Sequence, residues 1–165
     1  MAGGKAKSAA RAPRLWVLIL AAQRESQRML SEALRPLGIT PAQGEVLSVL
    51  SSHPPLTLNA LGERLVCETG SPSRLVSGLV RLGWVRRSPA PGDGRAVLLT
   101  LTGGGHRLAT RCLTVTGELE AELVALAEAP APVEASALDI TLRTLWRLVS
   151  HLPAGRALKR RAGKG

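Results

Sequence analysis

The sequence contains no phenylalanine and no tyrosine, and aromatic residues make up only 2% of its 165 positions. Hydrophobic residues still account for 45%, so a core must be built from leucine, valine, alanine and three tryptophans. A sizeable core is possible at this length. No apolar run approaches the ~20 residues of a membrane span, and we therefore expect no membrane segment.

Cysteine is scarce as well. The two cysteines, Cys67 and Cys112, lie far apart and have no ligand spacing beside them, which argues against a structural zinc site. Basic residues ahead of the apolar run 15–22 imitate a secretory signal, but apolar positions continue beyond that run at helical spacing, which favours an amphipathic helix. We expect such a chain in the reducing cytoplasm.

Signals of catalysis are missing too. The histidines, His53, His106 and His151, are dispersed along the chain. No glycine-rich phosphate loop follows a predicted strand, and no nucleophile motif has an identifiable base. We expect neither an enzyme nor a protein that carries a metal or another cofactor.

Positive charge is abundant, with a formal net charge of +10, and it is segregated along the chain. Residues 1–36, 57–111 and 143–165 are basic, whereas residues 118–142 carry six acidic and no basic side chains. Basic blocks of this kind are expected on surfaces that face a polyanion such as DNA. The alternative is a solubilised protein that is rich in arginine.

Apolar periodicity and helix-breaking residues predict a mainly α chain with a small β-hairpin. We expect a flexible basic arm over residues 1–13 and a basic tail over residues 153–165. The expected helices and strands between them lie at 14–35, 41–52, 58–66, 72–82, 84–88, 95–101, 103–129 and 134–151, of which 84–88 and 95–101 are the strands.

Capping residues sharpen several of these boundaries. Thr40, followed three residues later by Gln43, predicts a capping box at the start of the second helix. Thr57 is the expected cap of the third helix, and Gly83 is the expected end of the fourth. The positions of the fourth helix that we expect to point inward are Leu75, Val76, Leu79 and Leu82.

Two short helices and a hairpin, with basic residues on the second helix and the hairpin, follow the order of a winged helix-turn-helix. A helix fits the DNA major groove, the helix before it supports it, and the hairpin can follow the backbone toward the minor groove. Hydroxyl and guanidinium groups suit contacts with phosphates and bases. The candidate contacts on these elements are Thr69, Ser71, Ser73, Arg74, Ser77, Arg86 and Arg87.

The stretch Ile39–Gly105 resembles the MarR (multiple antibiotic resistance regulator) family. The residues that carry this resemblance are Leu61–Leu65, Ser73–Val76, Leu79, Gly83–Val85, Arg87, Asp93–Arg95, Leu101, Thr102 and Gly105. The resemblance implies a homodimer whose first, fifth and sixth helices interlock, with one winged helix in each subunit. It further implies that Arg95 enters the minor groove at the wing tip and that Asp93 orients a neighbouring arginine. A guanidinium suits a narrow, strongly negative minor groove.

Three positions depart from the family pattern. Glu68 stands where serine is frequent, and phosphates would repel its charge unless an arginine pairs with it. Gly94 replaces a residue that is commonly basic, so one wing contact is in doubt. Pro72 leaves open whether Thr69 or Ser71 caps the fourth helix. These changes affect the expected operator sequence and affinity rather than the fold.

We therefore predict a sequence-specific regulator of transcription that binds double-stranded DNA. Residues 39–101 are the predicted DNA-binding domain, and residues 14–38 and 102–152 are the predicted helical dimerisation region. The resemblance implies a repressor that acts as a homodimer on a pseudo-palindromic operator and is released by a small-molecule effector, bound between the dimer helices and the winged domain.

Two alternatives remain open at this point. The first is a redox-sensing regulator that uses Cys67, which lies just before the recognition helix. The competing interpretation is a buried structural role for Cys67 and for Cys112. The second alternative is an architectural DNA-binding protein without a regulatory role.

Overall fold

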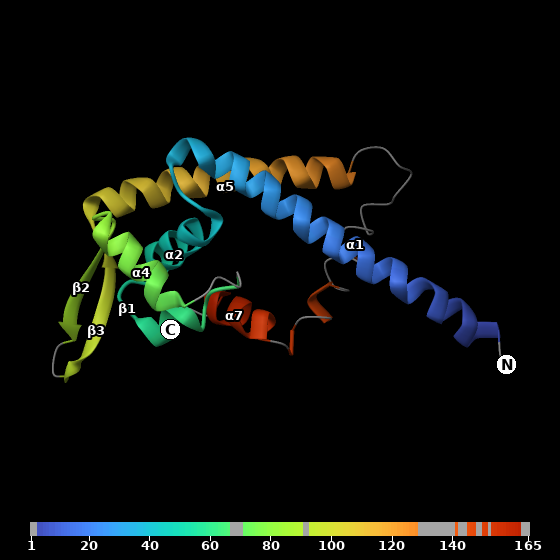
Figure 1. The fold of residues 1–165 in the computed structure, drawn as a ribbon, viewed down its shortest axis with the longest axis horizontal. Coiled ribbons are helices and arrows are strands. Elements are labelled where there is room, and N and C mark those ends of the chain that lie inside the picture. Colours follow the sequence, from blue (N-terminus) through green and yellow to red (C-terminus); the bar gives the residue numbers. More distant parts are fainter. Residues whose placement is uncertain are drawn as a thin grey trace.

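The computed structural model describes residues 3–66, 71–90, 93–128, 141, 145–147, 150–151 and 153–162. The elements, in chain order, are α1 (Gly3–Leu34), the 3-10 turn η1 (Arg35–Leu37), α2 (Pro41–Ser52), β1 (Leu56–Thr57), α3 (Leu58–Gly62), α4 (Pro72–Arg81), β2 (Val85–Ala90), β3 (Asp93–Leu101), α5 (Gly103–Glu128) and α7 (Pro153–Ala162). This arrangement confirms the mainly α fold with a winged helix-turn-helix (Figure 1). Within the described ranges, no helix is long and apolar enough to cross a bilayer.

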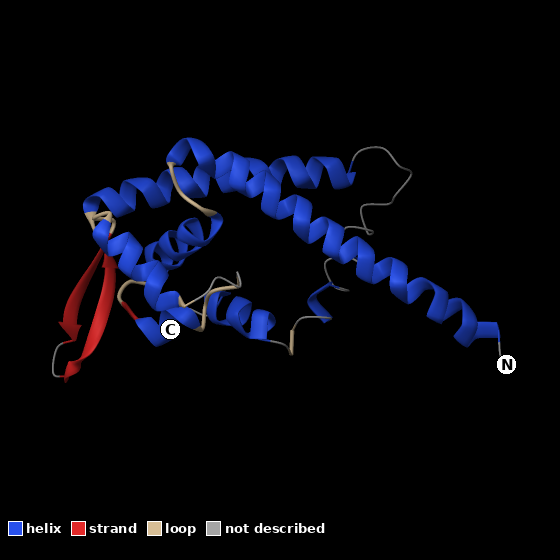
Figure 2. Cartoon of the chain, viewed as in Figure 1, coloured by secondary structure: helices blue, strands red, loops and turns tan. Residues whose placement is uncertain are grey.

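The wing is the hairpin formed by β2 and β3, and a short strand, β1, widens its base. The strands run antiparallel in the order β1-β3-β2. Leu56 of β1 lies opposite Leu99, and Val85 of β2 lies opposite Leu101. The hairpin extends from one end of the helical body (Figure 2). The sequence does not predict β1, because two residues are too few to show the alternation that identifies a strand.

Aliphatic side chains of α2, α3, α4 and the hairpin base form the core. The most deeply buried of them are Val46, Leu47, Leu50, Leu61, Val76, Leu79 and Leu99. Leu34 of α1 and Leu108 of α5 belong to the same buried cluster. The long helices and the winged helix therefore share one core, although the sequence assigns them to different regions.

Threonine caps fix the starts of the first two helices of the winged helix. Thr40 Oγ1 accepts a hydrogen bond from the Gln43 amide at 3.3 Å, and the Thr40 amide donates to Gln43 Oε1 at 2.9 Å. This confirms the capping box, which satisfies two amides that the helix itself leaves unpaired. Thr57 Oγ1 accepts from the Ala60 amide at 3.2 Å, which confirms the cap of α3.

The turn after α4 directs the chain into the wing. Gly83 has a φ of 72°, in the left-handed region that favours glycine, and the Trp84 amide donates to the Leu79 carbonyl at 3.0 Å. The predicted end of the helix at Gly83 is therefore confirmed. The prediction that Leu82 points inward is wrong, since that side chain is 51% exposed. Leu82 lies just past the last residue of α4, beyond the packed part of the helix.

The start of α5 is held against the start of the wing by Thr102 and Gly105. Thr102 Oγ1 donates to the Gly83 carbonyl at 2.7 Å and accepts from the Gly105 amide at 3.1 Å. The Thr102 amide donates to the Trp84 carbonyl at 3.0 Å. A Cβ at position 105 would overlap that carbonyl oxygen, so only glycine fits. These contacts give a physical reason for the Leu-Thr-x-x-Gly pattern in the sequence.

Both chain ends contain helices that the sequence analysis did not predict. The predicted flexible arm is helical from Gly3 onward, and the predicted basic tail is helical over Pro153–Ala162. Alanine, lysine and arginine are strong helix formers, so these segments form helices without an apolar stripe. The predicted helix over 134–151 falls mostly outside the described residues, although residues 145–147 have helical backbone.

Candidate nucleic-acid interface

The outer face of α4 is polar and exposed. Ser73, Arg74 and Ser77 are exposed there, whereas Val76 and Leu79 on the opposite face are buried. The sequence predicted this division from helical periodicity, and the structure places the three candidate contacts together on one surface. Such a surface offers hydroxyl and guanidinium donors to phosphates and base edges.

Ser71 is the N-cap residue of α4, and Pro72 follows it at the first helical position. This answers the question that the sequence left open between Thr69 and Ser71. The Ser71 side chain makes no capping hydrogen bond, and the residue is exposed. Its hydroxyl is thus available at the helix end where amides point outward and where anions are favoured.

The first strand of the wing lies next to α4 and carries two adjacent arginines. Arg86 and Arg87 are both exposed, and alternation along β2 sends them to opposite faces of the hairpin. Arg87 Nη2 donates to Ser77 Oγ at 3.0 Å. This hydrogen bond joins the wing to the recognition helix. The sequence analysis proposed Ser77 and Arg87 as DNA contacts but did not predict the hydrogen bond between them.

Part of the candidate site lies outside the described side chains. The backbone of Asp93 and Arg95 belongs to β3, at the end of the strand that is next to the hairpin turn, but their side chains are outside the described set. Thr69, Cys67 and Glu68 fall in the range 67–70, which is also outside it. The roles of Thr69, Asp93 and Arg95 therefore stay predictions.

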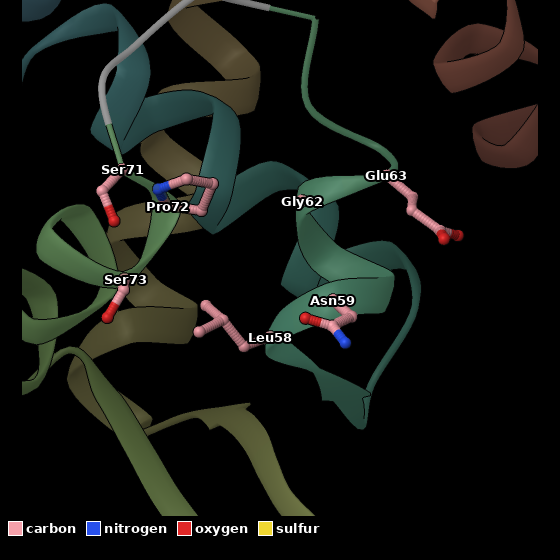
Figure 3. A pocket seen from close by; sticks show the side chains of 7 residues that line it. All are labelled: Leu58, Asn59, Gly62, Glu63, Ser71, Pro72 and Ser73. Atoms are coloured by element: carbon pink, nitrogen blue, oxygen red, sulfur yellow. The ribbon is translucent and has the colours of Figure 1, made fainter.

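A hollow of about 470 Å³ separates α3 from the start of α4. Its lining residues are Leu58, Asn59, Gly62, Glu63, Ser71, Pro72 and Ser73 (Figure 3). Leu58 reaches from α3 toward α4, whereas the Glu63 carboxylate points away from Ser71 and Ser73 (Figure 3). The sequence did not predict this hollow, because its two walls are separated along the chain by the 67–70 segment.

A long-range contact supports the chain just before that segment. Glu45 of α2 accepts a hydrogen bond from the Val66 amide at 2.7 Å through Oε1. The Arg64 guanidinium donates to the Ala60 carbonyl at 2.9 Å, which satisfies an acceptor near the end of α3. The sequence analysis missed Glu45 as a supporting residue, since nothing in a single sequence links positions 45 and 66.

Cys112 lies in the core between α5 and α2. It is 1% exposed, and burial raises the pKa of its thiol, an effect that a hydrogen bond with Ser48 partly opposes. Gly44 makes room for the sulfur, because a Cβ at that position would lie 3.0 Å from Sγ. This agrees with the interpretation of Cys112 as a buried structural residue.

Comparison with known proteins places this architecture among DNA-binding regulators. A family model described as the MarR family matches residues 37–96. The multiple antibiotic resistance protein MarR of Escherichia coli K12 is 37% identical over 101 residues, which cover 61% of this chain and 70% of that protein. The organic hydroperoxide resistance transcriptional regulator of Bacillus subtilis is 29% identical over 105 residues, which cover 64% of this chain and 71% of that protein.

A solved structure agrees over a longer stretch. The crystal structure of a MarR mutant from Escherichia coli, complexed with operator DNA, matches with a TM-score of 0.70 at 31% identity. The match covers 82% of this chain and 94% of that one. The family model, the relative and the solved structure thus agree, and this chain belongs to the MarR family of winged-helix transcriptional regulators.

Proposed function

We propose that this protein binds double-stranded DNA as a homodimer, that it represses transcription at a pseudo-palindromic operator, and that a small-molecule effector releases it. Family membership indicates a regulator and not an enzyme. In this proposal residues 39–101 bind DNA, and residues 14–38 and 102–152 form the dimerisation region. The DNA contacts are Thr69, Ser71, Ser73, Arg74, Ser77, Arg86, Arg87, Asp93 and Arg95.

One observation carries the proposal: the exposed polar face of α4 is joined to the wing by the hydrogen bond between Arg87 and Ser77. A recognition helix in the major groove and a wing on the backbone bind the same DNA segment, and this hydrogen bond holds the two elements next to each other. The Escherichia coli MarR structure at 31% identity contains operator DNA, which supports the same use of this fold.

The homodimer is supported by apolar side chains that this chain alone leaves exposed. On α1, α5 and the segment after it, these are Leu20, Leu113, Leu123, Val124, Leu145 and Trp146. Large apolar side chains that stay exposed on several helices are consistent with a surface that a partner covers. A second copy is the simplest partner, because a two-fold operation buries the same surface on both chains.

The shared core supports release by an effector. Leu34 of α1 and Leu108 of α5 pack in the same cluster as the winged helix, so a movement of the long helices would be passed to the winged helix through this core. A ligand that separates these helices would change the spacing of the two recognition helices in a dimer. A ligand shifts such an equilibrium only by its difference in affinity for the two arrangements.

Footprinting on the promoter region beside its gene tests the proposal. Two recognition helices in a two-fold dimer should protect half-sites about 10 base pairs apart, centre to centre. Arg95→Ala should keep the fold and weaken binding by about 1 to 3 kcal/mol at matched salt, because the proposal assigns Arg95 to a DNA contact and not to the core. A footprint without inverted symmetry, or equal affinity of parent and variant, would contradict it.

The redox alternative receives no support from Cys112. Its thiol is buried and its pKa is raised, whereas a reactive thiol needs access and a lowered pKa. Cys67 lies outside the described residues, so a redox role for it stays a hypothesis.

A further inference from the structure

The C-terminal helix α7 is rich in positive charge and contains no acidic residue. Its cations are Arg156, Lys159, Arg160 and Arg161. Arg156 and Lys159 are exposed, whereas Ala157 is only 3% exposed. The helix is therefore packed against the rest of the protein while two of its cations face solvent.

Arg160 connects α7 to the end of α3. Its Nε lies 3.4 Å from Glu63 Oε2, and its Nη1 donates to the Glu63 carbonyl oxygen at 3.4 Å. Glu63 is the C-cap residue of α3, where carbonyls lack helical partners and a cation is favoured. Both side chains are about half exposed, so this ion pair contributes little to stability. The contact shows that α7 lies against the end of α3, where Ala157 is buried.

The contact with Glu63 puts α7 beside the end of α3, the helix that precedes the recognition helix. Glu63 lines the hollow between α3 and α4 together with Ser71 and Ser73, and its carboxylate points away from these serines (Figure 3). Arg160 meets that carboxylate, and α7 lies beside the α3 end of the winged helix (Figure 1). Arg160 also offsets the negative charge that Glu63 would otherwise present near DNA phosphates.

Arg156 and Lys159, the exposed cations of α7, contact an uncharged carbonyl and an aromatic ring. Arg156 Nη1 donates to the His151 carbonyl at 3.0 Å, and Lys159 Nζ lies 5.8 Å from the centre of the Trp146 ring. A carbonyl and an aromatic ring both orient a cation and leave its net charge intact. Within the described part of the chain, neither Arg156 nor Lys159 forms an ion pair with a carboxylate.

We propose that α7 is an additional DNA-contacting element, in which Arg156 and Lys159 bind backbone phosphates beside the segment contacted by α4. This inference rests on the proposed function of the winged helix and extends it to a helix outside residues 39–101. Phosphate contacts add affinity without reading sequence, and each one increases the dependence of binding on salt.

The test measures how affinity for a long mixed-sequence DNA duplex changes with salt concentration. Arg156→Gln/Lys159→Gln in the full-length chain should lower the magnitude of the slope of log K against log salt by about 0.9 for each lost contact. Arg107→Gln/Arg111→Gln is the matched control, because it removes two exposed cations from α5 and should leave the slope unchanged. Arg74→Gln reports separately on the recognition helix.

The outcomes separate this inference from the proposed function. If Arg74→Gln weakens binding and Arg156→Gln/Lys159→Gln leaves both affinity and slope unchanged, the inference is wrong and the proposed function stands. If Arg74→Gln has no effect while the α7 variant lowers the slope, the α7 contact stands and the proposed DNA contact of Arg74 fails. A parent chain that does not bind the duplex overturns both.

Two further measurements address the role of charge and a different polyanion. The charge-conserving variant Arg156→Lys/Lys159→Arg should have the same slope of log K against log salt as the parent. A lower slope in this variant would show that the positive charge of these residues does not cause the salt dependence. Binding to phosphatidylserine vesicles distinguishes a membrane surface from DNA. If Arg156→Gln/Lys159→Gln abolishes vesicle binding and leaves the DNA slope unchanged, α7 contacts lipid and the proposal is overturned.

Discussion

The winged-helix core and the long helices that flank it carry similar apolar stripes but bury them differently. In the core, Leu47, Leu50 and Leu79 are fully buried. On the long helices and near the C-terminus, Leu113 is 46% exposed and Trp146 is 41% exposed. The apolar stripes of the winged-helix core are therefore covered by other parts of the same chain, whereas part of the apolar surface of the long helices stays exposed.

This difference shows what an amphipathic pattern can establish. A stripe of apolar residues predicts that a helix face will be buried, but it does not say whether the covering surface belongs to the same chain. In the core, short loops bring the partner helices together. On the long helices, the covering surface is expected from a second subunit, and four predictions follow in order of decreasing effect.

The largest effect is expected from shortening α1 at two different points. Removing residues 1–26 leaves Leu30 and Leu34, which pack in or against the core, and should yield a folded monomer. Affinity for a two-half-site operator should fall by about 10² to 10⁴-fold, because linked binding of two half-sites is lost. Size-exclusion chromatography with light scattering and DNA titration would measure both changes.

The matched comparison is removal of residues 1–36. That truncation also takes Leu30 and Leu34 from the core, so it should unfold or aggregate rather than give a soluble monomer. A stable dimer after removal of residues 1–26, or a monomeric parent at micromolar concentration, would show that the N-terminal helix does not build the dimer.

The second prediction concerns the contact between α5 and the wing. Gly105→Ala should lower the free energy of unfolding by about 3 kcal/mol, because its Cβ would overlap the Trp84 backbone carbonyl. Gly104→Ala is the control, since its Cβ would meet only side-chain atoms at 3.7 Å or more. Urea unfolding at one fixed protein concentration measures both variants. Similar stability of the two would contradict the proposed close approach.

Local signals account for much of what the sequence predicts correctly. The capping box at Thr40 and the turn at Gly83 each depend on residues within a few positions of one another, and both are confirmed. The exposed face of α4 follows from helical periodicity in the same way. For the candidate site, this periodicity suffices to group Ser73, Arg74 and Ser77.

Contacts between distant parts of the chain could not be predicted. The hydrogen bond from Arg87 to Ser77 and the ion pair of Arg160 with Glu63 depend on how elements pack, not on spacing in the sequence. The helical N-terminal segment was missed for another reason. Its propensity for helix comes from alanine and lysine composition, which carries no apolar period.

The third prediction tests the connection between the wing and the recognition helix. In a double-mutant cycle, Ser77→Ala and Arg87→Gln should show a coupling of about 0.5 to 1 kcal/mol in the free energy of unfolding, as expected for an exposed charged hydrogen bond. Arg86→Gln replaces the neighbouring exposed arginine and should not couple with Ser77→Ala. Equal coupling for Arg86 and Arg87 would mean that the contact has no specific energetic role.

The smallest effect is expected from Cys112, and it should appear only at alkaline pH. Burial raises the pKa of its thiol in the folded protein, whereas an unfolded cysteine ionises near pH ~8.5. Below that pH both states keep the proton and the full stability is present. Above it the unfolded state loses its proton first, so the free energy of unfolding should fall as pH rises toward the folded-state pKa.

Urea unfolding from about pH 7 to about pH 10 measures this slope in a Cys67→Ala background. Adding Cys112→Ala should lower stability at every pH and make the alkaline slope shallower, because the thiol that titrates differently in the two states is gone. Parallel pH profiles with and without Cys112 would show that its thiol is as accessible in the folded protein as in the unfolded chain.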